Sequence, residues 1–310
     1  IDNSCVFDLA STASMSRTPG SAGNRKTSTQ SMWVKRGNLG IDAAVGINVG
    51  NGLGLWFNSD DTMTWYCHYD SGWEGKLTTT QVFRDPGAWY HLVTMVDTTQ
   101  AVAANRAKVY VNGSQVTAFS VEDYPDQNDD TQFNDTVAHY ISVYGATPTY
   151  YFDGYIAEMH WIDGTALTPS SFGETNDEGV WVPKKYTAGS YGTTGFYLDF
   201  ADSSDLGDDE SGQGNDWAES NLAASDQRTD TPTNNQVTFN SLNNQQSGAD
   251  AITEGNTVYN GPSTRTMISL TSNIPSTGKW AVAFSASVVS TDAGWNFGIT
   301  KSNNSNFGDA

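Results

Sequence analysis

The sequence of 310 residues is poor in cysteine and contains no long apolar run. Cys5 and Cys67 are its only cysteines, too few for a disulfide scaffold, so the fold must depend on an apolar core. We expect two free, half-buried thiols, with one disulfide between them as the alternative. No apolar stretch approaches the ~20 residues that a membrane-spanning helix needs, so membrane insertion is not expected.

Basic residues are also scarce. Fifteen Lys and Arg stand against 35 Asp and Glu, which gives a net charge of −20, and the basic residues form no cluster. Such a negative field repels phosphate backbones, which excludes nucleic acid as an expected partner. The excess of carboxylates indicates solubility in a salty medium or, alternatively, acidic loops that bind Ca²⁺. The chain starts at Ile1 without a secretory signal, and we expect it to be a segment of a longer polypeptide.

Aromatic residues and glycine are abundant, with ten Trp, fourteen Tyr and thirty Gly. Short apolar runs with period-two alternation recur at intervals of roughly 8–12 residues, a pattern typical of an antiparallel β-sandwich. An opening strand is predicted over 1–16, with Cys5, Phe7 and Leu9 on one face. The other predicted strands are 29–36, 45–49, 53–58, 63–69, 76–83, 88–97, 107–112, 115–119, 138–144, 152–162 and 195–200.

Turn and helix patterns are few. Asn112-Gly113 predicts a two-residue hairpin, because both central positions of a type I′ turn need positive φ. One helical turn is predicted over 168–172, where Thr168 can cap and Pro169 suits the first helical position.

Four motifs follow one another in an order that carries a resemblance. They are 31–35 (SMWVK), 89–93 (WYHLV), 109–113 (VYVNG) and 152–159 (FDGYIAEM), with further agreement at 162–169 and 209–217. Together they resemble the laminin-G-like branch of the concanavalin A-like lectin/glucanase superfamily over roughly residues 1–217. The resemblance implies an all-β fold, an antiparallel two-sheet jelly-roll sandwich, in a domain of residues 1–231 with a C-terminal linker from about 218. This fold carries both binding modules and glycosidases, so the site residues must decide the function.

The remainder of the chain predicts a second unit. Residues 229–235 have the composition of a linker. Strand patterns resume at 265–271, 279–289 and 294–300. Parts of 276–300 resemble the first half of a SPRY-type sandwich, which makes 236–310 the N-terminal part of a second, incomplete β-sandwich. We expect 265–300 to pack against further chain beyond Ala310 or against neighbouring subunits of a homo-oligomer, because a half sandwich leaves apolar faces bare.

Residues for hydrolysis are missing from the expected places. Glucanases of this fold carry Glu-x-Asp-x-x-Glu on one strand, where carboxylates act as nucleophile and general acid. No Glu here has Asp two positions later, and Asp153 and Glu158 have the wrong spacing and order. The four histidines are dispersed without a zinc or Ser/His/Asp pattern, and His91 is expected to be a structural histidine of its strand. The chain is therefore predicted not to be an enzyme.

Two acidic loops, 122–135 and 199–216, are candidates for Ca²⁺, a hard ion that takes six to eight oxygen ligands. Neither matches an EF-hand, and a solvated acidic turn is the alternative. The favoured metal ligands lie in the second loop: Asp199, Asp202, Asp205, Asp208, Asp209 and Asp216.

Aromatic residues are candidates for a sugar-binding platform, with core packing as the alternative. On the strand 63–69, Trp65, Cys67 and Tyr69 share one face, and Tyr66 and His68 share the other. The candidate ligand-binding residues are Trp65, Tyr66, His68, Trp73, Tyr144, Tyr150 and Tyr151.

Residues 16–26 together with Trp33–Gly37 are similar to laminin-G-like virion proteins of marine tailed bacteriophages. The resemblance implies a non-enzymatic structural and adhesion protein on the virion surface, in a fibre, tail or capsid appendage outside the cell. Its expected partners are other virion subunits, as a homo-oligomer, and a host-surface polysaccharide. The alternatives are a polysaccharide-degrading enzyme with an unrecognised site and a structural decoration protein without a ligand.

Overall fold

The computed structural model describes residues 1–49, 53–69, 72–145, 149–240, 251–253, 255–260, 270 and 271. For 53, 68, 69, 72–74, 251, 253 and 260 it describes the backbone alone. Most of the region expected to form the second sandwich, including the strands predicted at 279–289 and 294–300, lies outside the described residues, so that expectation stays a prediction.

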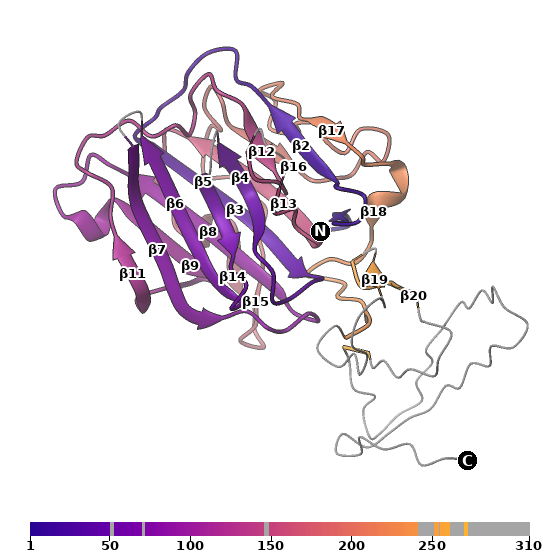
Figure 1. The fold of residues 1–310 in the computed structure, drawn as a ribbon. Helices are drawn as coiled ribbons and strands as arrows, with labels where there is room; N and C mark the ends of the chain where they lie inside the picture. Colours follow the sequence, from indigo (N-terminus) through magenta and orange to yellow (C-terminus); the bar gives the residue numbers. More distant parts are fainter. Residues whose placement is uncertain are drawn as a thin grey trace, which may run out of the picture.

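Two antiparallel sheets face each other (Figure 1). Sheet A has the order β10 (Ser114–Gln115), β9 (Ala107–Val111), β8 (Trp89–Asp97), β3 (Thr27–Arg36), β13 (Gly154–Asp163), β1 (Ser4–Phe7) and β18 (Gln227–Arg228), with β16 (Phe196–Leu198) also on β13. Sheet B has the order β11 (Phe119–Asp123), β7 (Gly72–Val82), β6 (Thr62–Tyr69), β5 (Leu53–Phe57), β4 (Ala43–Val49), β12 (His139–Ile141), β2 (Ser14–Arg17) and β17 (Ala218–Ser220). The predicted all-β, two-sheet fold is confirmed.

The small elements are three 3₁₀ turns and two hairpins. They are η1 (Ala103–Asn105), η2 (Pro169–Ser171), η3 (Ala224–Asp226), the β14 (Gly173–Thr175) and β15 (Trp181–Pro183) pair, and the β19 (Ala251–Thr253) and β20 (Val258–Asn260) pair.

The main core lies between the sheets and follows the alternation of the strands. Met32 and Val34 of β3 point into it from sheet A, and Leu55 and Phe57 of β5 point into it from sheet B. Cys5 and Cys67 are both buried and free, which confirms the expected free thiols, although they are fully rather than half buried. Burial raises the pKa of the Cys5 thiol, so it stays protonated.

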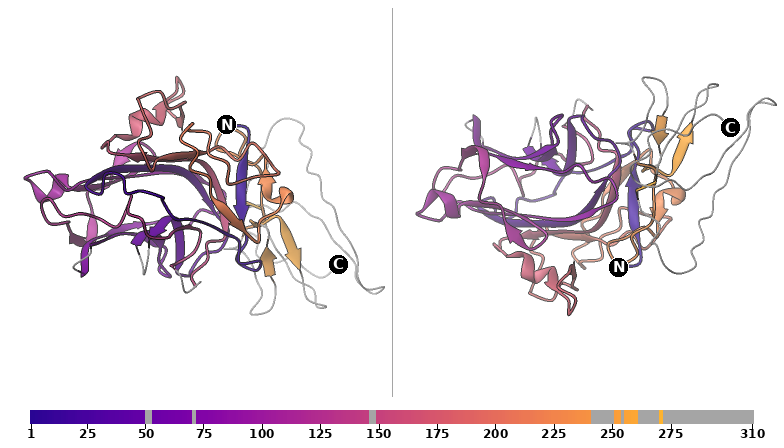
Figure 2. Two further views of the ribbon diagram at one scale, coloured as in Figure 1. Left: turned by 90° about the horizontal axis from the view of Figure 1, so that it is seen from above. Right: turned by 90° about the horizontal axis from the view of Figure 1, so that it is seen from below.

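The outer face of sheet A is covered by other parts of the chain. Figure 2 shows the two layers edge-on, with the pink segment around residues 165–190 standing on the outside of one layer. There Phe172 packs on Val93 and Ile162 in a second apolar cluster, and Trp181 of β15 packs near Trp33 in a third. Sheet A therefore presents little bare surface in this region.

Residues 229–239, here called the strap, form the other cover of sheet A. Asp230 is 3% exposed, and its carboxylate accepts hydrogen bonds from Lys35 Nζ at 2.8 Å and Trp89 Nε1 at 3.1 Å. Its carbonyl accepts one from Ser4 Oγ at 2.6 Å. The composition predicts a linker here; in the structure Asp230, Thr231 and Thr238 are buried, whereas residues 233–237 are exposed. Asp230 holds the strap to the sheet through its partners on β1, β3 and β8.

The opening strand differs from the prediction over 1–16. The chain forms two strands in opposite sheets, β1 and β2, joined by a turn in which Thr12 has a φ of 59°. Asp8 stabilises this turn by accepting a hydrogen bond from the Ser11 amide at 3.0 Å. The predicted strand 115–119 is likewise divided, between β10 of sheet A and β11 of sheet B.

Other local predictions fared better. Asn112 and Gly113 have positive φ and join β9 to β10, which confirms the hairpin. β16 returns to sheet A beside β13, as the alternation of residues 196–200 predicts. The helical turn η2 begins at Pro169, but the Thr168 hydroxyl makes no capping bond and instead pairs with the Ser170 hydroxyl, so its predicted cap is wrong.

Candidate functional site

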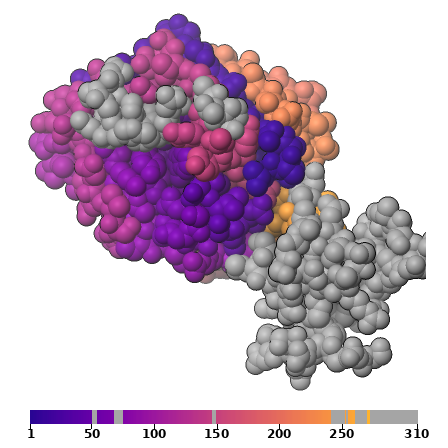
Figure 3. Space-filling view, viewed as in Figure 1, coloured from indigo at the N-terminus to yellow at the C-terminus, as the bar shows by residue number. Residues whose placement is uncertain are grey.

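Four aromatic side chains gather on the outer face of sheet B and are here called the aromatic patch: Trp56, Tyr66, Tyr144 and Tyr150. This sheet is turned toward the reader in Figure 1, and its surface over β4–β7 is the purple area of Figure 3. Unlike sheet A, this face has no covering hairpin in the described part of the chain.

The position of Trp56 follows from its strand. Leu55 and Phe57 belong to the core, so Trp56 between them must point to the opposite face. Trp56 is 9% exposed yet is no member of any apolar core cluster. Its burial comes from the tyrosines around it.

The rings of the patch meet edge to face. The Trp56 ring centroid lies 4.9 Å from that of Tyr144 and 6.4 Å from that of Tyr66, both in T-shaped arrangements. Tyr150 lies 5.4 Å from Trp56 and 5.9 Å from Tyr144, and it is 49% exposed. Such contacts fix the rings while leaving faces and hydroxyls at the surface.

Hydrogen-bond donors are concentrated in this patch. The indole N–H of Trp56 is buried and has no hydrogen-bond partner among the described residues. Burial, and then the proximity of the Tyr150 and Tyr66 hydroxyls, raises the pKa of Tyr144, so its hydroxyl stays protonated. A buried donor without a partner costs about 1–3 kcal/mol, a cost that an acceptor brought by a ligand would remove.

The patch can hold a ligand that offers both apolar C–H faces and oxygen acceptors. Aromatic rings supply large, rigid contact area at small entropic cost, and phenol and indole groups add hydrogen bonds. Sugars have this combination of groups. The four residues of the patch include no carboxylate, and their rings and donor groups suit the binding of a sugar.

Part of the aromatic platform predicted from the sequence is brought together here. Tyr66, Tyr144 and Tyr150 belong to the patch, and Tyr151 is half-buried beside it in sequence. Trp65 lies in the main core, 3% exposed, on the face that it shares with Cys67. The side chains of His68 and Trp73 lie outside the described residues. Trp56 was not predicted.

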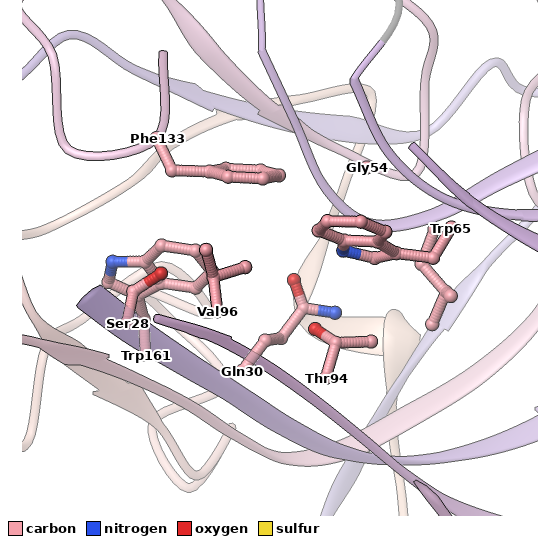
Figure 4. A pocket seen from close by; sticks show the side chains of 9 residues that line it. Ser28, Gln30, Gly54, Trp65, Thr94, Val96, Phe133 and Trp161 are labelled. Atoms are coloured by element: carbon pink, nitrogen blue, oxygen red, sulfur yellow. The ribbon is translucent and has the colours of Figure 1, made fainter. Parts of the chain in front are cut away.

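Trp65 lines a small interior cavity between the sheets (Figure 4). The Gln30 side chain stands between Trp65 and Trp161, and its Oε1 accepts a hydrogen bond from the Ile47 amide of β4 at 3.1 Å. The cavity has no free space large enough for a water molecule. It is therefore a packing feature in which Gln30 links the two sheets.

A buried Ser–His pair lies on the outer face of sheet A, but its hydrogen bonds have the wrong direction for catalysis. Trp181 Nε1 donates to His91 Nδ1 at 3.0 Å, so the neutral ring carries its proton on Nε2 and donates to Ser31 Oγ at 2.9 Å. Burial lowers the pKa of His91 to about 3. His91 cannot accept the serine proton and is structural.

A second polar cluster on this sheet joins Glu158, His160, Tyr191 and Tyr197. Tyr197 donates to Glu158 at 2.8 Å, and its ring stacks on that of His160 with centroids 4.3 Å apart. Burial raises the pKa of Glu158, but the hydrogen bond and charge of His160 outweigh it and hold the pKa below its usual value. Burial also raises the pKa of Tyr197, which keeps the phenol from acting as a nucleophile.

The acidic loop 199–216 is organised by its own backbone. Asp209 is 8% exposed and accepts hydrogen bonds from the amides of Tyr197, Ser211 and Asn215. Asp199, Asp202 and Asp216 each accept a backbone amide of the same loop. In the described part of the chain, no three His, Cys, Asp or Glu side chains are close enough to share a metal ion.

The calcium hypothesis for this loop stays a prediction with a direct test. Slight burial, and then the charges of Asp216 and Asp205, raise the pKa of Asp208, and a bound cation would relieve this repulsion. Millimolar Ca²⁺ should raise the melting temperature, since a ligand of the folded state stabilises it by mass action. Asp205→Asn combined with Asp208→Asn should remove the rise. Equal melting curves with Ca²⁺ and with chelator would contradict the hypothesis.

The helices of the described residues are short 3₁₀ turns, and none has the length and apolar character of a membrane span.

Comparison with known proteins identifies a family to which the sequence is similar. A family profile of laminin-G type, described as "Concanavalin A-like lectin/glucanases superfamily", matches residues 10–171. No curated protein sequence matches the chain.

Three solved structures are similar to this chain. A Bacteroides ovatus ATCC 8483 protein, a candidate carbohydrate binding protein, is 13% identical with a TM-score of 0.48; the match covers 74% of this chain and 60% of that one. The native heptameric SAP-like pentraxin of Limulus polyphemus is 13% identical with a TM-score of 0.39, covering 59% of this chain and 92% of the pentraxin chain. Domains LG4-5 of the mouse laminin alpha1 chain are 14% identical with a TM-score of 0.30, covering 50% and 41%.

At identities of 13–14% these similarities say nothing about function. The chain spans 60% of the length of the Bacteroides protein. The family profile carries the assignment, because residues 10–171 are 162 of the 310 residues, more than half. The chain belongs to the concanavalin A-like lectin/glucanases superfamily.

Proposed function

We propose that this chain is a non-enzymatic adhesion module that binds a host-surface glycan through the aromatic patch on sheet B. The observation that carries the proposal is the patch itself: three tyrosine rings around Trp56, whose buried indole N–H has no hydrogen-bond partner among the described residues. The patch lies on a sheet face that no hairpin of the described chain covers. A lectin-type fold with such a face supports binding of a sugar chain.

Binding is favoured over hydrolysis by the state of the groups that hydrolysis would use. His91 is neutral and donates to Ser31, and Glu158 is engaged by Tyr197 and lies near His160. Two carboxylates flanking a cleft are needed for glycoside hydrolysis in most families. A degrading enzyme with a different site is the alternative function, and the assay below distinguishes it.

The proposed location is the surface of a phage particle, in a fibre, tail or capsid appendage, with other virion subunits and further copies of this chain as neighbours. The support is the similarity of residues 16–26 and 33–37 to marine phage virion proteins. Immunogold labelling of intact particles with an antibody against the sandwich tests this location; particles that remain unlabelled would contradict it.

Binding through the patch predicts a loss of glycan affinity on two substitutions. Tyr150→Ala removes a half-exposed ring, and Trp56→Phe removes the indole N–H while keeping a ring. Each should weaken binding about tenfold, which corresponds to about 1.4 kcal/mol. The measurement is a glycan array followed by titration calorimetry on the best polysaccharide.

Trp181→Phe is the matched control, because it removes an indole N–H on the β14–β15 hairpin, which packs on the other sheet, and it should leave affinity unchanged. Unchanged binding by Tyr150→Ala and Trp56→Phe would contradict the proposed site. The same incubations should release no reducing ends; release would favour the enzyme. No binding to any glycan would favour the decoration protein.

A further inference from the structure

One basic side chain at the aromatic patch, Lys76, forms no ion pair with an acidic residue of the described chain. Lys76 of β7 pairs in register with Tyr66 of β6, and its ammonium lies 5.1 Å from the Tyr66 ring centroid. On the other side of β7, Asp123 of β11 is directly opposite Lys76. The two charged groups form no ion pair within 4 Å among the described residues, so Lys76 extends over the ring instead.

Five basic residues of the described chain form ion pairs with aspartates: Arg25, Lys26, Lys35, Arg36 and Arg84. Lys76 is not among them, and its ammonium lies over an aromatic ring of the patch instead. Lys76 is placed where its charge is available to a ligand of the patch.

We propose that the aromatic patch takes an acidic glycan, with a sugar carboxylate or sulfate held beside Lys76; this inference rests on the proposed function of the patch. The neighbouring groups are donors of the kind that an anion needs. The Trp56 N–H has no partner within the described chain, and the Tyr144 hydroxyl is kept protonated. Donors around an ammonium bind an anionic oxygen more strongly than a hydroxyl, because charge-assisted hydrogen bonds are the stronger ones.

The net charge of −20 does not oppose this inference at short range. At physiological ionic strength the screening length is about 8 Å, so carboxylates farther away contribute little at the patch. Long-range repulsion slows the approach of an acidic chain, but the contact itself is decided by the groups within this length: Lys76, its register partner Asp123 and the donors of the patch.

The test uses polysaccharides that differ in charge alone. A polyuronate is compared with its carboxyl-reduced form, and dextran sulfate with dextran, by titration calorimetry on the full chain at 0.15 M salt. The wild-type protein should bind at least one acidic member about fivefold more tightly than its neutral counterpart. The pair that shows the difference identifies the carboxylate or the sulfate as the recognised group.

Lys76→Gln should abolish that ratio, and Lys76→Arg should restore it. Lys108→Gln on β9 of sheet A is the matched control and should leave the ratio unchanged. Equal affinity for acidic and neutral members, or a ratio that survives in Lys76→Gln, overturns the inference. If neutral glycans bind as tightly as acidic ones and Tyr150→Ala weakens that binding, the proposed function stands and the preference for acidic glycans fails. If no glycan binds, the proposed function fails as well.

Discussion

Asp230→Ala is expected to lower the free energy of unfolding by about 3–5 kcal/mol, the usual cost of removing one partner of a buried ion pair. Lys35 and Asp230 are almost fully buried, with side-chain exposures of 1% and 4%. Burial lowers the pKa of Lys35, and the charge of Asp230 offsets this effect. Without Asp230 the ammonium would be left in the interior, and the strap would lose the acceptor shared by Lys35 and Trp89.

Urea unfolding monitored by tryptophan fluorescence measures this effect. A variant without either charge provides the control, because removing both charges leaves no unpaired ion. Lys35→Met with Asp230→Leu should therefore be clearly more stable than Asp230→Ala alone. A loss below 1 kcal/mol in Asp230→Ala would show that the strap is a loosely attached segment, as its composition suggests.

The second large effect is a loss of stability between pH 6.5 and 4.5. Burial lowers the pKa of His91 to about 3 and that of His139 to about 4, against about 6.5 in an unfolded chain. Below pH 6.5 the unfolded chain therefore takes up protons that the folded chain does not. The stability contributed by both histidines is complete above that pH and is lost as the pH falls toward 4 and 3.

Each of these groups changes the free energy of unfolding by up to about 1.36 kcal/mol per pH unit, so each should cost about 2–3 kcal/mol by pH 4.5. Urea titrations at pH 7.5, 6.5, 5.5 and 4.5 measure the slope. His91→Gln, which can still donate to Ser31 and accept from Trp181, should flatten the slope by about half. A free energy that is constant across this range would show that the two imidazoles are accessible to protons.

The sequence predicted those elements whose signals are local. The Asn112-Gly113 hairpin is specified by two adjacent residues, and β16 by the alternation of Phe196, Tyr197 and Leu198. The prediction of a single opening strand over 1–16 was wrong because of a local feature, a turn. The Asp8 turn reverses the chain within a run whose period-two pattern is unbroken, so periodicity alone could not locate it.

The site was only partly predictable. Alternation places Trp65 and Tyr66 on opposite faces, but it does not say which face meets the core. Trp56 has apolar neighbours on both sides, Leu55 and Phe57, and reads like any core residue. Tyr144 and Tyr150 were named from the sequence as candidate exposed aromatics. Their convergence on Trp56 depends on the pairing of β4, β5 and β6, which is a long-range property.

The strap shows the same limit most clearly. Its residues are the small polar ones that composition assigns to linkers. The burial of Asp230 among them depends on Lys35 and Trp89, which are 195 and 141 positions away. Polar groups can be buried when each finds a partner. No local pattern reports where such partners lie.

The strap also brings the two ends of the sandwich together. The carbonyl of Ile1 accepts hydrogen bonds from Thr231 Oγ1 and Thr233 Oγ1, and Ser4 pairs with Arg228 in the β1–β18 ladder. A folded unit whose chain arrives and departs at one point can be inserted into a surface loop of another protein without forcing that loop open. The sandwich thus has the geometry of a domain that can be inserted into a loop of a longer polypeptide. Its attachment lies at the strap and β1, not on the strands β5 and β6 that carry Trp56 and Tyr66.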